Sequence, residues 1–282
     1  MPTVITGTQG FGLLSECELT EEQFRYISGV LHKHAGIRMP DGKQGLVRAR
    51  LTKRLRALGL VDFDSYLDLV TGDPTGREFR EMVDVLTTNK TSFLREAAHF
   101  DYLRDIIFPQ HSGPLRLWSA GCSTGEEPYT LAMLCNDRSP DCASNTTRIL
   151  ATDISHRVLE RAKAGTYSAD DMAAVPSSWL RQYWTAARDA HGRDVFEAGT
   201  SLRQLVQFAR LNLMDRWPMQ GPFDAIFCRN VMIYFDKATQ QQLVQRYWAL
   251  LRPGGHLFVG HSESLTGLSH RFRYVQPAVY VR

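Results

Sequence analysis

Two glutamates follow a glycine-rich turn near the middle of the chain. Residues 117–129 read Leu-Trp-Ser-Ala-Gly-Cys-Ser-Thr-Gly-Glu-Glu-Pro-Tyr, which predicts a strand, a Gly-x-x-x-Gly loop and a helix. Such a loop lets backbone amides approach a ligand closely. It is neither the dinucleotide fingerprint nor a phosphate loop, because no Gly-Lys-Ser/Thr follows. Glu126 and Glu127 would repel a pyrophosphate, so the loop favours a ligand with a cationic part. The alternative is a tight turn whose glutamates only favour the helix dipole.

A third carboxylate, Asp153, follows the next predicted strand, residues 148–152. In open parallel sheets ligands bind outside the carboxyl ends of the strands, where an acidic residue holds ribose hydroxyls. Asp153 could instead cap the helix that begins near Ser155, since Asp is a favoured capping residue. Together with the glycine loop, Asp153 indicates a cofactor that contains adenosine.

Polar residues also end the buried run that starts at Phe223. Arg229 and Asn230 follow this predicted strand, and Tyr234 comes four residues after Asn230. A doubly wound sheet binds its reacting substrate at this edge. Tyr234 could equally be a core residue with a satisfied hydroxyl, which is the commoner situation for an isolated tyrosine.

A parallel sheet is needed to bring these residues together. After Pro109 short apolar runs alternate with helical stretches, which is typical of an α/β fold with a doubly wound, mostly parallel sheet and helices on both faces. We expect strands at 115–119, 148–152, 205–210, 223–228 and 256–260, with helices at 126–135, 155–163 and 237–251. Residues 273–276 and 278–281 predict an antiparallel hairpin on the sheet edge. Residues 168–204 break the alternation and predict an inserted β-subdomain with a helix at 177–187.

The N-terminal part predicts a separate all-helical domain. We expect a flexible tail at 1–18, the helical domain at 19–90 and the α/β domain at 91–282. Thr20 and Gln23 have the spacing of a capping box, and the first helix should end at Gly36. Further helices are expected at 43–58, 63–70 and 75–87. The second has an apolar stripe formed by Val47, Leu51, Leu55 and Leu58.

This second helix is also strongly basic. Between Lys43 and Leu60 the chain has six basic residues and no acidic one. Most of the basic positions lie off the apolar stripe, so we expect them to tolerate charge reversal. A solvated helix face is one interpretation, and a docking face for an acidic partner helix is the other. The candidate docking residues are Arg50, Lys53, Arg54 and Arg56.

Composition excludes several classes of protein. The chain has 282 residues, of which 43% are hydrophobic and 22% charged, as in soluble globular proteins. No apolar run reaches the ~18 residues of a membrane helix. The five cysteines are scattered, which favours reduced thiols in the cytoplasm and argues against a structural zinc site. The nine histidines lack metal-ligand spacing, so we predict no metal, and a net charge of +3 does not require a nucleic acid.

These motifs together resemble the CheR family, the chemoreceptor glutamate O-methyltransferases that use S-adenosylmethionine. The resemblance runs from about residue 15 to the C-terminus and rests on six ordered blocks, at 88–96, 119–129, 151–154, 211–213, 223–236 and 251–263. It implies a class I methyltransferase-like fold, S-adenosylmethionine as cofactor and S-adenosylhomocysteine as product. The implied substrate is the cytoplasmic helices of a methyl-accepting chemotaxis protein, and we expect a monomer.

The resemblance also implies the site residues. Positions that match the family's cofactor-binding residues are Asn89, Thr91, Arg95, Glu127, Asp153, Asn212, Leu213, Arg229 and Asn230. Arg95 and Tyr234 match residues implicated in methyl transfer, and the basic helix matches the receptor-docking element. The inserted subdomain docks a receptor C-terminal peptide in some members. Peptide-binding members tend to have a glycine-rich loop there, whereas residues 186–192 contain one glycine.

Two other functions fit parts of the sequence. A nucleic-acid methyltransferase could grip phosphates with the basic helix. Amino-methylating DNA enzymes, however, usually carry Asp/Asn-Pro-Pro-Tyr where this chain has Arg229-Asn230-Val-Met. The other function is a non-catalytic scaffold that senses the cofactor, against which Arg95 and Tyr234 both argue. The sequence therefore predicts a protein-glutamate O-methyltransferase that neither binds nucleic acid nor inserts into a membrane.

Overall fold

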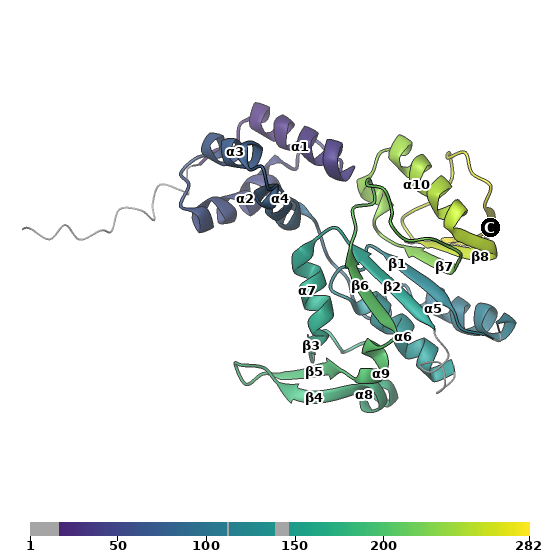
Figure 1. Cartoon of the computed structure of the whole chain (residues 1–282). Helices are drawn as coiled ribbons and strands as arrows, with labels where there is room; N and C mark the ends of the chain where they lie inside the picture. The colour runs from purple at the N-terminus through teal and green to yellow at the C-terminus, as the bar shows by residue number, and fades with distance from the viewer. Residues whose placement is uncertain (1–16, 112, 139–146) are drawn as a thin grey trace, which may run out of the picture. The chain divides into compact units, whose positions relative to one another are not determined.

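The computed structural model describes residues 17–111, 113–138 and 147–282 (Figure 1). The chain divides into two compact units, residues 1–88 and 89–282, so the division lies two residues before the predicted boundary. The tail predicted at 1–18 falls almost entirely outside the described residues. In the described ranges no helix has the length and apolar character needed to cross a membrane.

The first unit is all-helical. Its helices are α1 (Glu21–Ala35), α2 (Gln44–Leu58), α3 (Phe63–Gly72) and α4 (Arg77–Leu86). The capping box at the start of α1 is confirmed, because the Thr20 hydroxyl accepts from the Gln23 amide while the Gln23 side chain accepts from the Thr20 amide. Gly36 ends α1 with φ 70°, a left-handed conformation that glycine adopts without strain.

The apolar stripe of α2 is shorter than predicted. Val47, Leu51 and Leu55 are fully buried, but Leu58 is 36% exposed. The prediction for Leu58 is therefore wrong. Leu58 is the last residue of α2, and Gly59 turns the chain away immediately after it with φ 70°.

Two of the basic side chains of α2 brace this unit internally. Arg54 donates two hydrogen bonds to the buried carboxylate of Glu78, at 2.8 and 2.6 Å. Arg50 donates to the carbonyls of Leu86 and Thr87 at the end of α4. The expectation that these positions tolerate charge reversal is therefore wrong for Arg50 and Arg54. A glutamate at position 54 would face the carboxylate of Glu78, and a glutamate at position 50 would face the carbonyl oxygens at the end of α4.

The second unit is built on a seven-stranded sheet with the order β6-β2-β1-β7-β8-β10-β9. The strands are β1 (Arg116–Ala120), β2 (Arg148–Asp153), β6 (Val206–Arg210), β7 (Phe223–Cys228), β8 (Leu251–Val259), β9 (Arg273–Gln276) and β10 (Val279–Val281). β1 pairs in parallel with both β2 and β7, and β7 pairs in parallel with β8. β9 and β10 form an antiparallel hairpin at the edge. The predicted α/β fold is confirmed.

The order of the strands defines where a ligand should bind. From β1 the chain moves outward to β2 and β6, and it then returns to place β7 on the other side of β1. The direction of winding therefore reverses between β1 and β7. In such sheets the crevice outside the carboxyl ends of the strands at this reversal is the usual ligand site. The glycine loop follows β1, and Arg229 follows β7.

Helices cover both faces of the sheet, as predicted (Figure 1). They include α5 (Ala98–Tyr102), α6 (Glu126–Arg138), α7 (His156–Ala164) and α10 (Lys237–Leu250). Leu117 of β1 belongs to a core cluster with α6 residues, whereas the neighbouring Trp118 packs against Tyr247 of α10 with ring centroids 5.5 Å apart. Successive strand residues point to opposite faces, so α6 and α10 lie on opposite sides.

One helical segment was not predicted. α5 continues into a π-helical turn, η2 (Leu103–Ile107), and a short 3-10 turn, η3 (Phe108–Gln110). Its Phe100 stacks on Phe227 of β7 with ring centroids 6.3 Å apart, so this segment covers the same core as α6.

The inserted β-subdomain forms a second, antiparallel sheet with the order β3-β5-β4. It contains β3 (Thr166–Ser168), α8 (Ser177–Tyr183), β4 (Trp184–Arg188), β5 (Asp194–Ala198) and α9 (Thr200–Arg203). The helix predicted at 177–187 is wrong beyond Tyr183. Residues 184–188 pair with β5 instead, and Trp184 is buried against the rings of Phe93 and Tyr129.

Candidate functional site

The glycine loop bends back over the end of β2. Gly121 and Gly125 have φ 104° and 100°, which side-chain-bearing residues rarely adopt. The amides of Gly121 and Cys122 donate to the Thr152 carbonyl at 2.8 and 2.9 Å. A methyl group on Gly125 would lie 2.7 Å from the Tyr167 hydroxyl, so only glycine fits there. The loop is therefore a rigid part of the sheet edge.

Asp153 joins this loop to the end of β2. Its carboxylate accepts from the amides of Ser123 and Ser155, both at 2.9 Å, and the residue is 9% exposed. The helix cap that was the alternative for Asp153 belongs to Ser155, whose hydroxyl accepts from the Val158 amide. Asp153 stands at the carboxyl end of a parallel strand, where an acidic residue is suited to hold ribose hydroxyls.

A buried guanidinium lies between two carboxylates at the same edge. The Arg229 side chain is 2% exposed and donates to Glu127 at 2.8 Å and to Glu96 at 3.1 Å. It also donates to the Arg95 carbonyl. Ser119 of β1 donates to the second Glu127 oxygen at 2.6 Å. A buried charge is tolerated only when it is paired and hydrogen-bonded, and this network supplies both for Arg229.

Burial and pairing act differently on the acids of this edge. Burial raises the pKa of Glu127, and the nearby Arg229 opposes it without cancelling it. Burial also tends to raise the pKa of Glu96, but there the charge and hydrogen bonds of Arg229 prevail and the pKa is lowered. Burial raises the pKa of Glu126, although the Thr124 hydroxyl, which lies within hydrogen-bond distance of both carboxylate oxygens, opposes this. The edge therefore gathers several acids and the Arg229 guanidinium in a poorly hydrated place.

The turn after β7 holds two more of the predicted residues. Asn230 is left-handed with φ 58°, and its side-chain amide donates to Glu96 at 3.3 Å. A 3-10 turn, η5 (Met232–Tyr234), follows directly. Tyr234 is half-buried, and its hydroxyl makes no hydrogen bond to any described residue. This does not match the alternative of a core tyrosine with a satisfied hydroxyl.

Arg95 occupies a strained loop next to this turn. The residues on either side, Leu94 and Glu96, have φ 55° and 57°, a conformation that costs energy without glycine. The Arg95 guanidinium donates to the Lys90 carbonyl at 2.7 Å and forms no ion pair with any described residue. Its remaining donors can therefore bind a carboxylate.

The remaining predicted residues lie in two turns at the same edge. The Asn89 carbonyl accepts from the Ser123 hydroxyl at 3.0 Å, which places the 89–91 segment, with half-buried Thr91, beside the glycine loop. Asn212 and Leu213 follow β6, and the Leu211 amide donates to the Asp153 carbonyl. The structure thus brings these predicted residues of the second unit to one edge of the sheet.

Sequence reasoning missed two residues of this network, Glu96 and Glu263. Glu96 accepts from Arg229, Asn230 and the His261 amide, and Glu263 accepts from three backbone amides. A signal in the sequence was available: each of these glutamates is the last residue of a motif block, 88–96 or 251–263, and has no obvious partner nearby in the chain.

Glu96, His99 and His261 also bring potential metal-ligand atoms within 4.8 Å of one another. The Arg229 guanidinium, however, lies 3.1 Å from a Glu96 oxygen. A metal cation there would be repelled by this buried charge, so we interpret the cluster as part of the ion-pair network.

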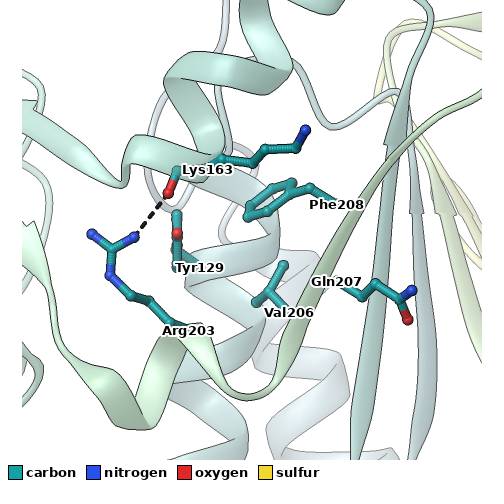
Figure 2. A pocket seen from close by; sticks show the side chains of 6 residues that line it. All are labelled: Tyr129, Lys163, Arg203, Val206, Gln207 and Phe208. Atoms are coloured by element: carbon teal, nitrogen blue, oxygen red, sulfur yellow. Dashed lines mark hydrogen bonds between the residues drawn. The ribbon is translucent and has the colours of Figure 1, made fainter.

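A separate hollow of about 320 Å³ lies against α6, α7 and β6 (Figure 2). It is lined by Tyr129, Lys163, Arg203, Val206, Gln207 and Phe208. None of these is a predicted site residue. The Arg203 guanidinium already donates to three carbonyls, those of Ala198, Lys163 and Ala164. This hollow is therefore distinct from the candidate site.

The donor set at the sheet edge fits S-adenosylmethionine. Asp153 can accept from ribose hydroxyls, and the acids around Glu127 suit the positively charged amino and sulfonium groups. The Nε atom of Arg229 is buried without a hydrogen-bond partner among the described residues, so the edge also has an unsatisfied donor. An adenosine ligand with both cationic and carboxylate groups matches these features.

Comparison with known proteins agrees with this geometry. Residues 89–281 match the CheR methyltransferase SAM-binding domain, and residues 22–87 match the CheR all-alpha domain. The chain is 41% identical over 263 residues to the chemotaxis protein methyltransferase of Escherichia coli, covering 93% of this chain and 91% of that protein. It is 39% identical over 285 residues to chemotaxis protein methyltransferase 2 of Pseudomonas aeruginosa, covering 99% and 97%.

Solved structures are more distant. The glycopeptide N-methyltransferase MtfA complexed with sinefungin aligns with a TM-score of 0.37 and 14% identity, over 60% of this chain and 54% of that one, a likeness too weak to carry an argument. The second family match covers most of the first structural unit and the first match covers almost all of the second, and the curated relatives match over almost their whole length. The chain therefore belongs to the CheR family of S-adenosylmethionine-dependent chemotaxis protein methyltransferases.

Proposed function

We propose that this protein methylates glutamate side-chain carboxylates on the cytoplasmic helices of chemoreceptors, giving glutamate methyl esters and S-adenosylhomocysteine. The observation that carries the proposal is that two side chains keep donors uncommitted. Arg95, whose carbonyl accepts from the buried Arg229, uses its guanidinium only toward the Lys90 carbonyl among the described residues. Tyr234, in the turn that follows Asn230, has a hydroxyl with no hydrogen-bond partner among them. These are the groups needed to hold an incoming carboxylate. The names of the relatives support a chemotaxis substrate, and such a substrate implies a cytoplasmic enzyme.

When bound, S-adenosylmethionine supplies a methyl group activated by its positively charged sulfur. A glutamate carboxylate has a pKa near ~4.3 and is ionised at neutral pH, so the protein needs no general base. Its tasks are alignment and the exclusion of water. A poorly hydrated site also favours the transfer, because the charges of the carboxylate and the sulfonium group cancel as it proceeds.

Each protein group has a defined part in this mechanism. Arg95 would hold one or both oxygens of the incoming glutamate with its planar donors. Tyr234 would donate a hydrogen bond that orients the same carboxylate. Asp153 would hold the ribose, with Glu127 near the cationic end of the cofactor. Arg229 stays buried and keeps Glu96, Glu127 and the Arg95 loop in place.

Receptor docking is assigned to the exposed part of the basic helix. Lys53 and Arg56 are exposed on α2, and their side chains form no hydrogen bond or ion pair with any described residue, so they are available to an acidic helix. Arg50 and Arg54 contribute indirectly by bracing α2 against α4. A tethering peptide at the β-subdomain is not required by this mechanism.

The test is incubation with methyl-labelled S-adenosylmethionine and a receptor cytoplasmic fragment. We expect label that is released by mild base as methanol, and we expect its loss when the accepting glutamates are changed to alanine. An Arg95→Ala variant should raise the receptor KM while binding S-adenosylhomocysteine nearly normally. If it instead loses cofactor affinity, Arg95 holds the cofactor carboxylate.

Base-stable label, or label on another residue type, would contradict the proposed ester. Cofactor binding without any turnover on several receptor fragments would favour the non-catalytic scaffold. The names of the curated relatives give that alternative no support.

A further inference from the structure

We propose that Glu263 is a positioning residue for methyl transfer: its buried carboxylate sets the turn that carries Asn230 and Tyr234. Glu263 follows β8, whereas Asn230 and Tyr234 follow β7. The inference rests on the proposed function, because it assigns Glu263 a role only through those two residues.

The Glu263 carboxylate joins three backbone amides from two segments. One oxygen, Oε2, accepts from the Asn230 amide at 2.8 Å and from the Gly260 amide at 2.5 Å. The other, Oε1, accepts from the Ile233 amide at 3.0 Å. Asn230 and Ile233 lie about thirty residues before Glu263, so the side chain clamps the end of β7 to the end of β8.

This clamp holds a tight corner. Glu263 is 8% exposed. A methyl group on Gly260 would lie 2.9 Å from both the backbone nitrogen of Asn230 and Glu263 Oε2, so the corner has no spare room. Asn230 is held left-handed at φ 58°. Without the carboxylate, the three amides would lose their acceptor and the corner would relax.

A charged clamp here is costly, which indicates a specific role. Glu263 forms no salt bridge with any described residue, and burial raises its pKa although the backbone amides oppose this. A buried carboxylate without a cation is tolerated only where its hydrogen bonds are strong. Ile233, whose amide it holds, is the residue immediately before Tyr234 in η5. Shifts of about 1 Å at a reacting group can lower rates about 10²-fold.

The two oxygens allow a selective variant. Glu263→Gln keeps one acceptor oxygen and replaces the other with an NH2 group. The favoured orientation keeps the oxygen where two amides converge, at Asn230 and Gly260, and places the NH2 group against the Ile233 amide. Cofactor binding through Asn230 should then survive, while η5 and Tyr234 lose their support.

We expect kcat of Glu263→Gln to fall about tenfold, with the Kd for S-adenosylhomocysteine within about twofold of wild type. The matched control is Asp224→Asn, at the other end of β7, where the carboxylate is equally buried at 8% exposure. This control variant should be less stable than wild type. Its kcat, measured at a temperature well below its melting temperature, should equal the wild-type value. If Glu263→Gln does not fold, Glu263→Asp is the second variant, because it shortens the side chain by one carbon. It should likewise lower kcat and leave the Kd for S-adenosylhomocysteine nearly unchanged.

A double-mutant cycle with Tyr234→Phe decides the matter. If Glu263 acts through Tyr234, the double variant should be no slower than Tyr234→Phe alone. Two outcomes would overturn the positioning role only. One is a double variant whose loss of kcat equals the product of the two single losses. The other is a wild-type kcat in Glu263→Gln while Tyr234→Phe is impaired. A wild-type kcat in Tyr234→Phe would instead overturn the proposed role of Tyr234, and the positioning role with it.

Discussion

Strand β7 has a buried ionic network at each end, and the two networks are built in opposite ways. At the amino end the carboxylate of Asp224 is the centre. It accepts from the Arg116 amide at 2.7 Å and from Arg252 at 2.6 Å, and His111 lies 3.0 Å away. At the carboxyl end the guanidinium of Arg229 is the centre, between Glu96 and Glu127.

The two ends differ further in burial and backbone strain. The Arg252 and His111 side chains are 33% and 20% exposed, whereas Arg229 is 2% exposed. Among the non-glycine residues with positive φ in the described ranges, all but Ala278 lie at the carboxyl edge: Leu94, Glu96, Ser123 and Asn230. Such conformations cost about 1–3 kcal/mol each and cluster at functional sites. We infer that the amino end ties strands together, while the carboxyl end holds a strained site in place.

The largest effect should come from removing the centre of the carboxyl-end network. Arg229→Met would leave Glu96 and Glu127 buried without a cation, which typically costs about 3–5 kcal/mol. We expect a large loss of unfolding free energy in urea and loss of S-adenosylhomocysteine binding by calorimetry. The control, Arg252→Met, removes a more exposed arginine from the other network and should keep cofactor affinity. Equal effects of the two variants would remove the distinction between the ends.

A smaller, more selective loss is expected at Asp153. Asp153→Ala should weaken cofactor binding by about 1–3 kcal/mol, because it removes the acceptor for the ribose hydroxyls. It also leaves the Ser123 and Ser155 amides without their carboxylate partner, so stability must be measured alongside. Calorimetry would disprove the assignment if a folded Asp153→Ala variant kept wild-type affinity.

The amino end should show the reverse pattern. Asp224→Asn should lower the free energy of unfolding by about 1–3 kcal/mol, because Arg252 and His111 lose a charged partner. Cofactor affinity should not change, since Asp224 lies at the opposite end of the strand from the site. A loss of affinity in the folded variant would show that both networks support the site.

The smallest effect is expected from exposed cations that belong to neither network. Reversing Lys53 and Arg56 to glutamate should weaken receptor binding at low salt by roughly 0.2–1 kcal/mol per residue. The weaker binding should appear as a higher receptor KM. The difference should shrink as salt approaches ~0.1 M, where charges are screened over ~10 Å. Arg25→Glu, an exposed reversal on α1, is the control. The docking role fails if the control raises KM as much, or if the double reversal leaves KM unchanged at low salt.

Local signals in the sequence were sufficient for much of this molecule. The Thr20 capping box, the alternation of strands and helices, the glycine loop and Asp153 at the end of β2 depend on residues that are neighbours in the chain. A parallel sheet must then bring the carboxyl ends of its strands to one edge. The motif blocks therefore predicted the family, and they place the candidate site at this edge.

Tertiary structure decided the features that depend on distant partners. Trp184 leaves the predicted helix because burial against Phe93 and Tyr129, with pairing to β5, outweighs local propensity. Arg54 braces α4 through Glu78, 24 residues away, although its sequence pattern indicates an exposed face. Glu96 meets Arg229 across 133 residues, and Glu263 meets Asn230 across 33. A buried charge is stable only with its partners in place, and no local pattern along the chain contains those partners.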